Sequence, residues 1–153
     1  MTEQSYITTI AVDASPDAAY AAINDVHGWW GHDIDGPTDV VGAAFVFRGQ
    51  DMHRARIEVA ESVPGKRVVW HVVDNYFTFT ADQSEWVDTT IRFDISPTDS
   101  GSLIRFSHIG LLPEHECYDV CAPAWTFFIV DSLRALINSG NGEPMAKHPA
   151  AVA

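Results

Sequence analysis

Two cysteines four residues apart, Cys117 and Cys121, are the residues whose types and spacing first suggest chemistry. On a helix this spacing holds the Cβ atoms about 5–6 Å apart, whereas a disulfide needs about 3.5–4.5 Å, so a bond between them would be strained. A zinc site would need further ligands. His115 would point to nearly the opposite side of the helix, which leaves His108 to complete a metal or redox site. The interpretation we favour is two reduced thiols packed in a core.

A second polar group lies in HGWWGHDID, residues 27–35, which contains His27, His32, Asp33 and Asp35. Imidazole and carboxylate groups of this kind could bind a cation. Their spacing follows no metal-binding pattern, however. We therefore interpret the segment as a polar loop that is anchored by one of its two tryptophans.

Three histidines fall on expected strands: His53 and His108 on inner faces, and His71 on a strand that is apolar on both sides. A buried histidine can act as a general base or bind a ligand, although more often it is hydrogen-bonded within the core. Ser107 cannot form a dyad with His108, because neighbours in a strand face opposite sides. The sequence shows neither a carboxylate pair nor a glycine-rich phosphate loop. We name no catalytic residue and expect neither metal nor cofactor.

The segments that must position these residues alternate apolar and polar side chains from residue 43 onward. This period of two predicts strands, separated by short turns typical of antiparallel sheets, at 43–49, 52–63, 66–73, 76–80, 85–95 and 102–110. A further strand is expected at 5–13. It is followed by a helix at 17–25, which begins after Ser15 and Pro16, and by a short helix or turn at 26–31.

Residues 114–139 predict a helix about 39 Å long at 1.5 Å per residue. Pro113 can start it, Pro123 removes one backbone donor inside it, and Gly140 can end it. No other element is large enough to cover one face of the sheet. We therefore predict an α+β fold in which a curved antiparallel sheet of six or seven strands wraps around this helix. Its apolar stripe, at three-to-four spacing, contains Cys117, Cys121, Ala124, Trp125, Phe128, Ser132 and Leu136.

Four segments and the order of the elements resemble the START-like or SRPBCC superfamily: EWVDTTIRFDI at 85–95, GSLIRFSHIGLLP at 101–113, ECYDVCAPAW at 116–125 and SLRALINSGNGEP at 132–144. The sequence is similar to the branch related to the activator of a heat-shock chaperone ATPase. This resemblance implies a helix-grip fold with a pocket for apolar or amphipathic small molecules. It implies no single reaction, because members include binders, cyclases, hydroxylase domains and co-chaperone-like proteins. Asp88 stands where the motif has glycine.

The length of 153 residues predicts one domain, residues 1–144, followed by a flexible tail at 145–153. Nine lysines and arginines against 21 acids give a net charge of −12, which opposes nucleic acids and anionic membranes. We recognise neither a leader-like start nor an apolar stretch of roughly 18–20 residues. We therefore expect a cytoplasmic protein that binds neither nucleic acid nor membrane.

The chain's 5 Trp, 8 Phe and 4 Tyr could build an apolar pocket. We expect a hydrophobic or amphipathic small molecule between sheet and helix, oriented by His53, His108 and Tyr118. Two alternatives stay open: a co-chaperone-like or stress-related protein with a chaperone or homodimer contact, and a cyclase- or hydrolase-type enzyme that uses His108. The predicted cavity-lining residues are Trp30, Phe45, His53, Trp70, Phe93, Phe106, His108, Cys121, Trp125 and Phe128.

Overall fold

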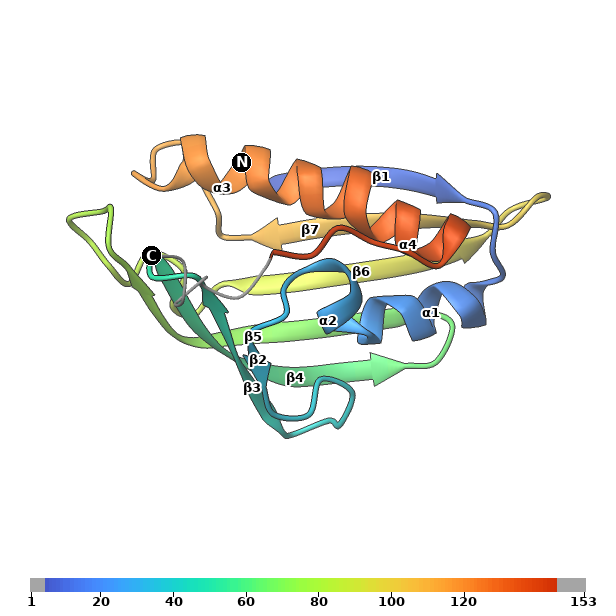
Figure 1. Cartoon of the computed structure of the whole chain (residues 1–153), viewed down its shortest axis with the longest axis horizontal. Coiled ribbons are helices and arrows are strands. Elements are labelled where there is room, and N and C mark those ends of the chain that lie inside the picture. Colours follow the sequence, from blue (N-terminus) through green and yellow to red (C-terminus); the bar gives the residue numbers. More distant parts are fainter. Residues whose placement is uncertain (1–4, 146–153) are drawn as a thin grey trace, which may run out of the picture.

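A seven-stranded antiparallel sheet with the strand order β1-β7-β6-β5-β4-β3-β2 dominates the computed structural model, which describes residues 5–145. Two short helices, α1 (Pro16–Asn24) and α2 (Val26–Trp29), follow the first strand, and one long helix follows the last (Figure 1). The predicted α+β helix-grip fold is confirmed. The strands are β1 (Tyr6–Val12), β2 (Ile34–Asp35), β3 (Ala44–Gly49), β4 (His53–Val63), β5 (Arg67–Phe77), β6 (Thr90–Pro97) and β7 (Ser102–Ile109).

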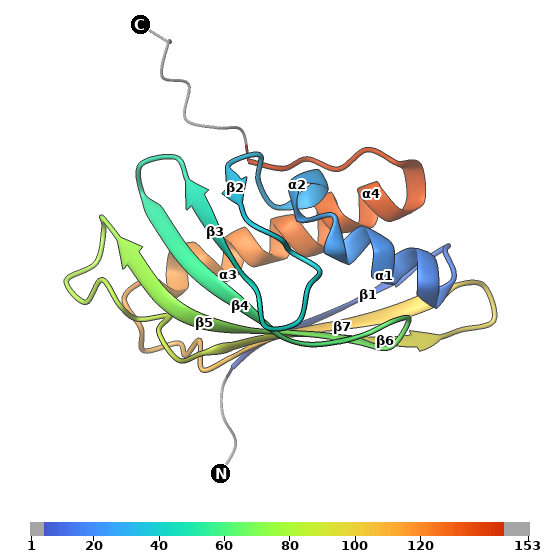
Figure 2. The same ribbon diagram turned by 90° about the horizontal axis from the view of Figure 1, so that it is seen from below.

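The C-terminal helix lies in the concave face of the curved sheet, with α1 and α2 beside it (Figure 2). It runs through three consecutive segments, α3 (Tyr118–Thr126), the π-helical η1 (Phe127–Leu133) and α4 (Arg134–Ser139). Pro123 stays inside α3 without ending the helix, and Gly140, at φ 87°, ends α4 in the left-handed conformation that glycine favours. The prediction is wrong only at the start, because residues 113–117 form turns.

Within the described residues, Tyr118–Ser139 is the one helix long and apolar enough to cross a bilayer, with a mean hydropathy of 1.5. Its length and composition differ from the expectation that no apolar stretch approaches roughly 18–20 residues. In the structure this helix is the core helix of the domain, since Trp125, Ile129 and Leu133 are buried beneath it against the sheet. Burial thus accounts for the apolar side chains on the inward face of this helix.

Local signals around α1 and α2 act as predicted. The Ser15 side chain accepts a hydrogen bond from the Ala18 amide at 3.2 Å, and Pro16 occupies the first turn. Trp29 is fully buried and donates its indole N–H to the Ile23 carbonyl at 3.0 Å. These contacts fix the two helices that close one side of the concave face.

Two strand predictions are wrong at their ends. The segment predicted at 76–80 is no separate strand, because β5 continues through irregularities in its pairing with β4 and ends at Phe77. The strand predicted from residue 85 begins only at Thr90, since residues 84–88 form turns. Asp88 has a φ of +66°, so the aspartate that replaces the glycine of the family motif occupies a backbone conformation that glycine favours.

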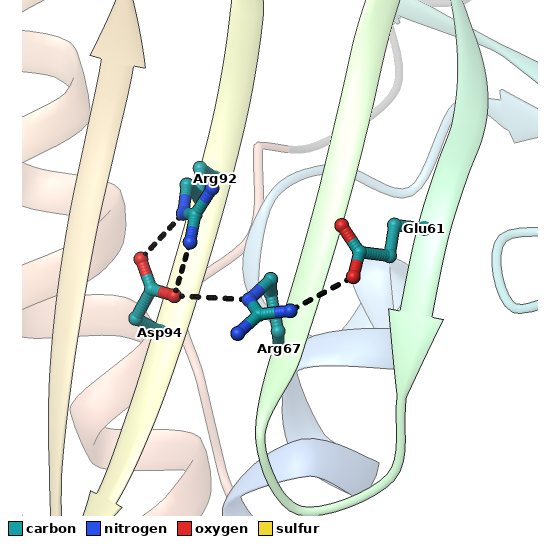
Figure 3. A network of polar contacts seen from close by, with 4 residues as sticks. All are labelled: Glu61, Arg67, Arg92 and Asp94. Atoms are coloured by element: carbon teal, nitrogen blue, oxygen red, sulfur yellow. Dashed lines mark hydrogen bonds and ion pairs between the residues drawn. The ribbon is translucent and has the colours of Figure 1, made fainter.

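Charged side chains cross-link three strands on the outer face of the sheet (Figure 3). Arg67 on β5 lies 2.8 Å from Glu61 on β4 and 3.3 Å from Asp94 on β6, and Arg92 binds Asp94 at 2.7 Å. Burial alone would raise the pKa of Asp94, but the two arginines outweigh it and hold that pKa below its usual value. The network stabilises the solvent face and leaves the concave face to the apolar core.

Aromatic rings fill the middle of the interface between sheet and helices. Trp29 stacks on Trp70 with ring centroids 6.3 Å apart, and Phe45 and Phe93 meet Trp70 edge-on at 5.2 and 5.1 Å. Phe93 in turn contacts Phe106 at 5.1 Å. Because these rings interdigitate, the space left for a ligand lies toward one end of the interface.

Candidate functional site

A half-open pocket of about 90 Å³ lies between the concave face of the sheet and α3. The wall is apolar except for one imidazole, and none of these described residues carries a full charge at neutral pH. This composition is typical of small-molecule sites, although drug-sized ligands occupy roughly 300–1,000 Å³. The lining residues are Trp30, Phe47, Gly49, Met52, His53, Phe77, Phe79, Trp86, Val120, Cys121, Ala124, Trp125, Phe128 and Met145.

Strand alternation and helical spacing bring these side chains together. Phe47 faces inward on β3 and stacks on Trp30 at a centroid distance of 4.0 Å. Gly31 and Gly49 make room for that ring, since an added Cβ would lie 2.9 and 3.2 Å from it. Opposite, α3 presents Cys121 and Trp125 one turn apart. The pocket is therefore formed by the β3–β4 hairpin, the end of β5 and α3.

Five of the ten residues predicted to line a cavity lie on this wall: Trp30, His53, Cys121, Trp125 and Phe128. Four others, Phe45, Trp70, Phe93 and Phe106, are fully buried in the aromatic core and do not reach the wall. A ligand contact for any of them stays a prediction. The sequence identified correctly which aromatic side chains face inward. It could not distinguish those that line the pocket from those that pack in the core.

His108 lies behind the pocket wall, and both its ring nitrogens are engaged. The Trp125 indole N–H donates to His108 Nδ1 at 3.0 Å, so Nε2 carries the proton and donates to the Thr89 hydroxyl at 2.8 Å. Burial lowers the pKa of His108 to about 3, with smaller contributions from His53 and His115. His108 is thus a neutral side chain that positions Trp125.

His53 is the imidazole on the pocket wall. The Asn75 side-chain amide donates to the Gln83 carbonyl at 3.1 Å, so its oxygen faces His53 and accepts the Nε2–H bond at 2.7 Å. Burial lowers the pKa of His53 to about 4, which keeps the ring uncharged at neutral pH. Its Nδ1 is therefore a hydrogen-bond acceptor.

Both cysteines are free thiols and buried, as the favoured interpretation predicted. A hydrogen bond with Cys121, together with burial, raises the pKa of Cys117, so Cys117 stays a thiol. Across residues 5–145, no group of three or more His, Cys, Asp and Glu side chains is arranged to hold a metal ion. With both nitrogens of His108 engaged, the considered set of Cys117, Cys121 and His108 does not form.

The polar loop at 27–35 also has structural partners. The His27 ring N–H donates to the Ile34 carbonyl at 3.0 Å. Asp35 and Asp33 both contact the Arg48 guanidinium, at 2.6 and 3.4 Å. The carboxylates that could have served a cation thus tie this loop to β3, in agreement with the interpretation as an anchored loop.

Sequence reasoning missed Trp86, which is 3% exposed and forms part of the wall. Strict alternation over 85–95 places it on the outer face. Trp86 instead lies within the turns at 84–88, where strand alternation does not apply. Asp88 in place of the motif glycine hid the left-handed backbone at this position, which a glycine would have indicated. The other wall residues not predicted are Phe47, Gly49, Met52, Phe77, Phe79, Val120, Ala124 and Met145.

A reciprocal pair of carboxylates joins the loop at 78–89 to the start of the long helix. Glu116 accepts hydrogen bonds from the Ala81 and Asp82 amides at 2.9 and 3.2 Å. Glu85 accepts from the Glu116 and Cys117 amides at 2.8 and 3.0 Å. We call these four bonds the carboxylate clasp. Because the loop carries Phe79 and Trp86, the clasp holds one side of the pocket against α3.

The last described residue completes the site. The Met145 amide donates to the Trp30 carbonyl at 2.9 Å, and its own carbonyl accepts from the His32 amide at 2.9 Å. Its side chain lines the pocket. The rest of the predicted tail, 146–153, lies outside the described residues.

A curved antiparallel sheet, a gripped C-terminal helix and an apolar pocket between them define a helix-grip domain of the START-like, or SRPBCC, class. The chain belongs to the family of Activator of Hsp90 ATPase homolog 1-like proteins, whose family model matches residues 13–138. None of the curated proteins compared with the sequence matches it.

Several solved structures share the fold. The Aha1 dimer from Colwellia psychrerythraea is 24% identical with a TM-score of 0.74, and the match covers 93% of this chain and all of that one. MLL2253 from Mesorhizobium loti is 19% identical with a TM-score of 0.69, over 87% and 96% of the two chains. DynU16, from the dynemicin biosynthetic locus, is 16% identical with a TM-score of 0.69, over 92% of this chain and 49% of its own. Identities this low establish the fold alone.

Proposed function

We propose that this protein binds a hydrophobic or amphipathic small molecule in the pocket between the sheet and α3. The observation that carries the proposal is an aromatic pocket whose mouth leaves apolar side chains in water. Met52, Phe79 and Val120 line the pocket and are 51%, 38% and 47% exposed. Covering such a surface with an apolar ligand is favourable at about 25 cal/mol per Å². The presence of the same fold in a protein from a biosynthetic locus, DynU16, supports this choice.

The predicted residues divide into two roles under this proposal. Trp30, His53, Cys121, Trp125 and Phe128 contact the ligand. The remaining predicted residues, Phe45, Trp70, Phe93, Phe106 and His108, support the wall from behind.

The size of the pocket limits how the ligand sits. A pocket of about 90 Å³ is smaller than the roughly 150 Å³ cavity that binds benzene, so a bound ring would lie partly in the exposed mouth. Deeper entry requires the loop at 78–89 to move away from α3, which breaks the carboxylate clasp. Native mass spectrometry of protein purified from its own host would detect a retained ligand directly.

A fluorescence titration with the neutral dye N-phenyl-1-naphthylamine tests the site. We expect saturable binding to the wild-type protein. Trp125→Ala removes a buried wall and should weaken binding at least tenfold. Because that variant also loses core packing, Val120→Asp at the exposed mouth serves as a second test. Phe127→Ala, an exposed position outside the pocket lining, is the matched control. Unchanged affinity in both pocket variants would place the site elsewhere.

A co-chaperone-like role is the second candidate, because the chain belongs to a family described by the activation of the Hsp90 ATPase. A homodimer is part of this candidate, since the Colwellia relative is a dimer. The ATPase rate of the host's own Hsp90 would be measured with increasing amounts of the protein. A rate that does not change at a molar excess removes this role.

A cyclase- or hydrolase-type enzyme is the third candidate. Its expected base, His108, has both nitrogens hydrogen-bonded and is not part of the pocket wall, so we assign His108 a positioning role. A role in stress and a cytoplasmic location stay predictions.

A further inference from the structure

Trp86 brings an unused hydrogen-bond donor to the pocket wall. Its indole is 3% exposed, and its Nε1 is buried with no acceptor in the described part of the chain. A buried N–H without a partner costs roughly 1–3 kcal/mol, so native structures seldom leave one without a reason. Trp70 Nε1 also lacks an acceptor, but Trp70 lies in the closed core. Among the described residues, only Trp86 combines an unpartnered buried N–H with a place on the pocket wall.

His53 supplies the complementary group. Its Nε2–H is committed to Asn75, so Nδ1 is left as an acceptor, and within residues 5–145 no donor is bonded to it. The His53 and Trp86 rings lie edge to face with centroids 4.5 Å apart. The two rings are therefore in contact on the pocket wall.

The surrounding wall selects the rest of the ligand. The indoles of Trp30, Trp86 and Trp125 lie within 35° of parallel in each pairing, with centroids 5.0 to 6.5 Å apart. Flat rings pack well against such faces. No charged side chain of the described residues lines the pocket, so a carboxylate or an ammonium buried there would go unpaired. A 150 Å³ cavity is known to bind benzene, and this smaller pocket opens at its mouth.

We propose that the pocket recognises an uncharged phenolic ring, whose hydroxyl oxygen accepts from Trp86 Nε1 while its O–H donates to His53 Nδ1. This inference rests on the proposed function and specifies its ligand class. The hydroxyl satisfies both leftover groups at once, and the ring occupies the aromatic wall. Substituents on the ring extend across Met52, Phe79 and Val120 at the mouth.

Four compounds of nearly equal shape test the inference on the full-length protein by calorimetric or NMR titration. They are p-cresol, 4-methylanisole, toluene and p-toluate. We expect p-cresol to bind about tenfold more tightly than toluene, the usual effect of a hydrogen bond to a buried group. Methylanisole accepts but cannot donate, so it should fall between the two. The charged p-toluate should bind most weakly.

Two variants and one spectrum assign the polar contacts. Trp86→Phe keeps a ring and removes the donor, so the affinity for p-cresol should fall by a larger factor than the affinity for toluene, and the preference for p-cresol should disappear. Phe127→Ala, at an exposed position outside the pocket lining, is the control and should keep the preference. In the wild-type protein the Trp86 indole N–H resonance should move downfield with p-cresol and not with toluene. That measurement stands even where a variant folds poorly.

The outcomes separate the two claims. Equal affinities for p-cresol and toluene, with no shift of the Trp86 resonance, overturn the phenol inference and leave apolar binding in the pocket intact. If neither the four compounds nor the neutral dye binds, both the phenol inference and the proposed small-molecule binding are refuted.

Discussion

Acidification from pH 7.5 to pH 5.5 should destabilise the fold through His108. The ring is buried, both its nitrogens are hydrogen-bonded, and its pKa is lowered to about 3. In the unfolded chain a histidine has a pKa near 6.5. The stability due to this difference is therefore fully present above pH 6.5, and it is lost as the pH falls toward the folded value, because only the unfolded state gains a proton.

The size of this loss of stability depends on how far the pH lies below 6.5, the pKa of histidine in the unfolded chain. At pH 5.5, one unit below the unfolded pKa, the unfolded state gains about 1.4 kcal/mol per histidine that stays neutral in the fold. His53, with a pKa lowered to about 4, contributes in the same direction. It contributes less than His108, since its ring is only partly buried. The two together should cost between 1.4 and roughly 3 kcal/mol over these two pH units.

Urea unfolding at the two pH values measures this loss. Carboxylates and the remaining histidines titrate in wild type and variant alike, so the comparison with His108→Gln isolates one group. The variant is expected to be less stable at pH 7.5, yet its stability should fall by about 1.4 kcal/mol less than that of the wild type on acidification. Equal losses in both proteins would refute the reasoning. So would an imidazole NMR titration of wild-type His108 with a midpoint near pH 6.5.

Three further outcomes follow from the same contacts. Glu116→Ala removes two of the four hydrogen bonds of the carboxylate clasp. It should lower the free energy of unfolding in urea by about 1–2 kcal/mol and speed hydrogen exchange in the loop at 78–89. Glu114→Ala, at an exposed neighbouring position, is the control and should change neither quantity. Asp88→Gly relieves the backbone strain of a non-glycine residue at positive φ and should raise the free energy of unfolding by up to about 1 kcal/mol. Asp88→Ala keeps that strain and should lower the free energy of unfolding. A change of the same sign in both variants would contradict the strain argument. Trp125→Phe keeps the ring but leaves His108 Nδ1 unpaired, so it should cost about 1–3 kcal/mol by thermal or urea unfolding. A neutral effect there would show that His108 does not need its indole partner.

The site was predictable only in part, for reasons that particular residues make plain. Cys121, Trp125 and Phe128 were found because helical spacing places them on one stripe, and His53 because strand alternation places it inside. Phe93 obeys the same alternation yet ended in the solid core. The sequence pattern predicts on which face of a strand or helix a residue lies. It does not predict whether that residue lines a pocket or fills the core, because this depends on how neighbouring side chains interdigitate.

Most elements and their order were predictable from local sequence signals: alternation indicated the described strands other than β2, Ser15 and Pro16 began α1, and Gly140 ended the long helix. These signals act over a few residues, so they survive without knowledge of the fold. Only the tertiary structure decided where the pocket lies and that Trp86 belongs to it. Trp86 lies in the turns at 84–88 rather than in a strand, and the rings that contact it come from a strand and a helix distant in sequence.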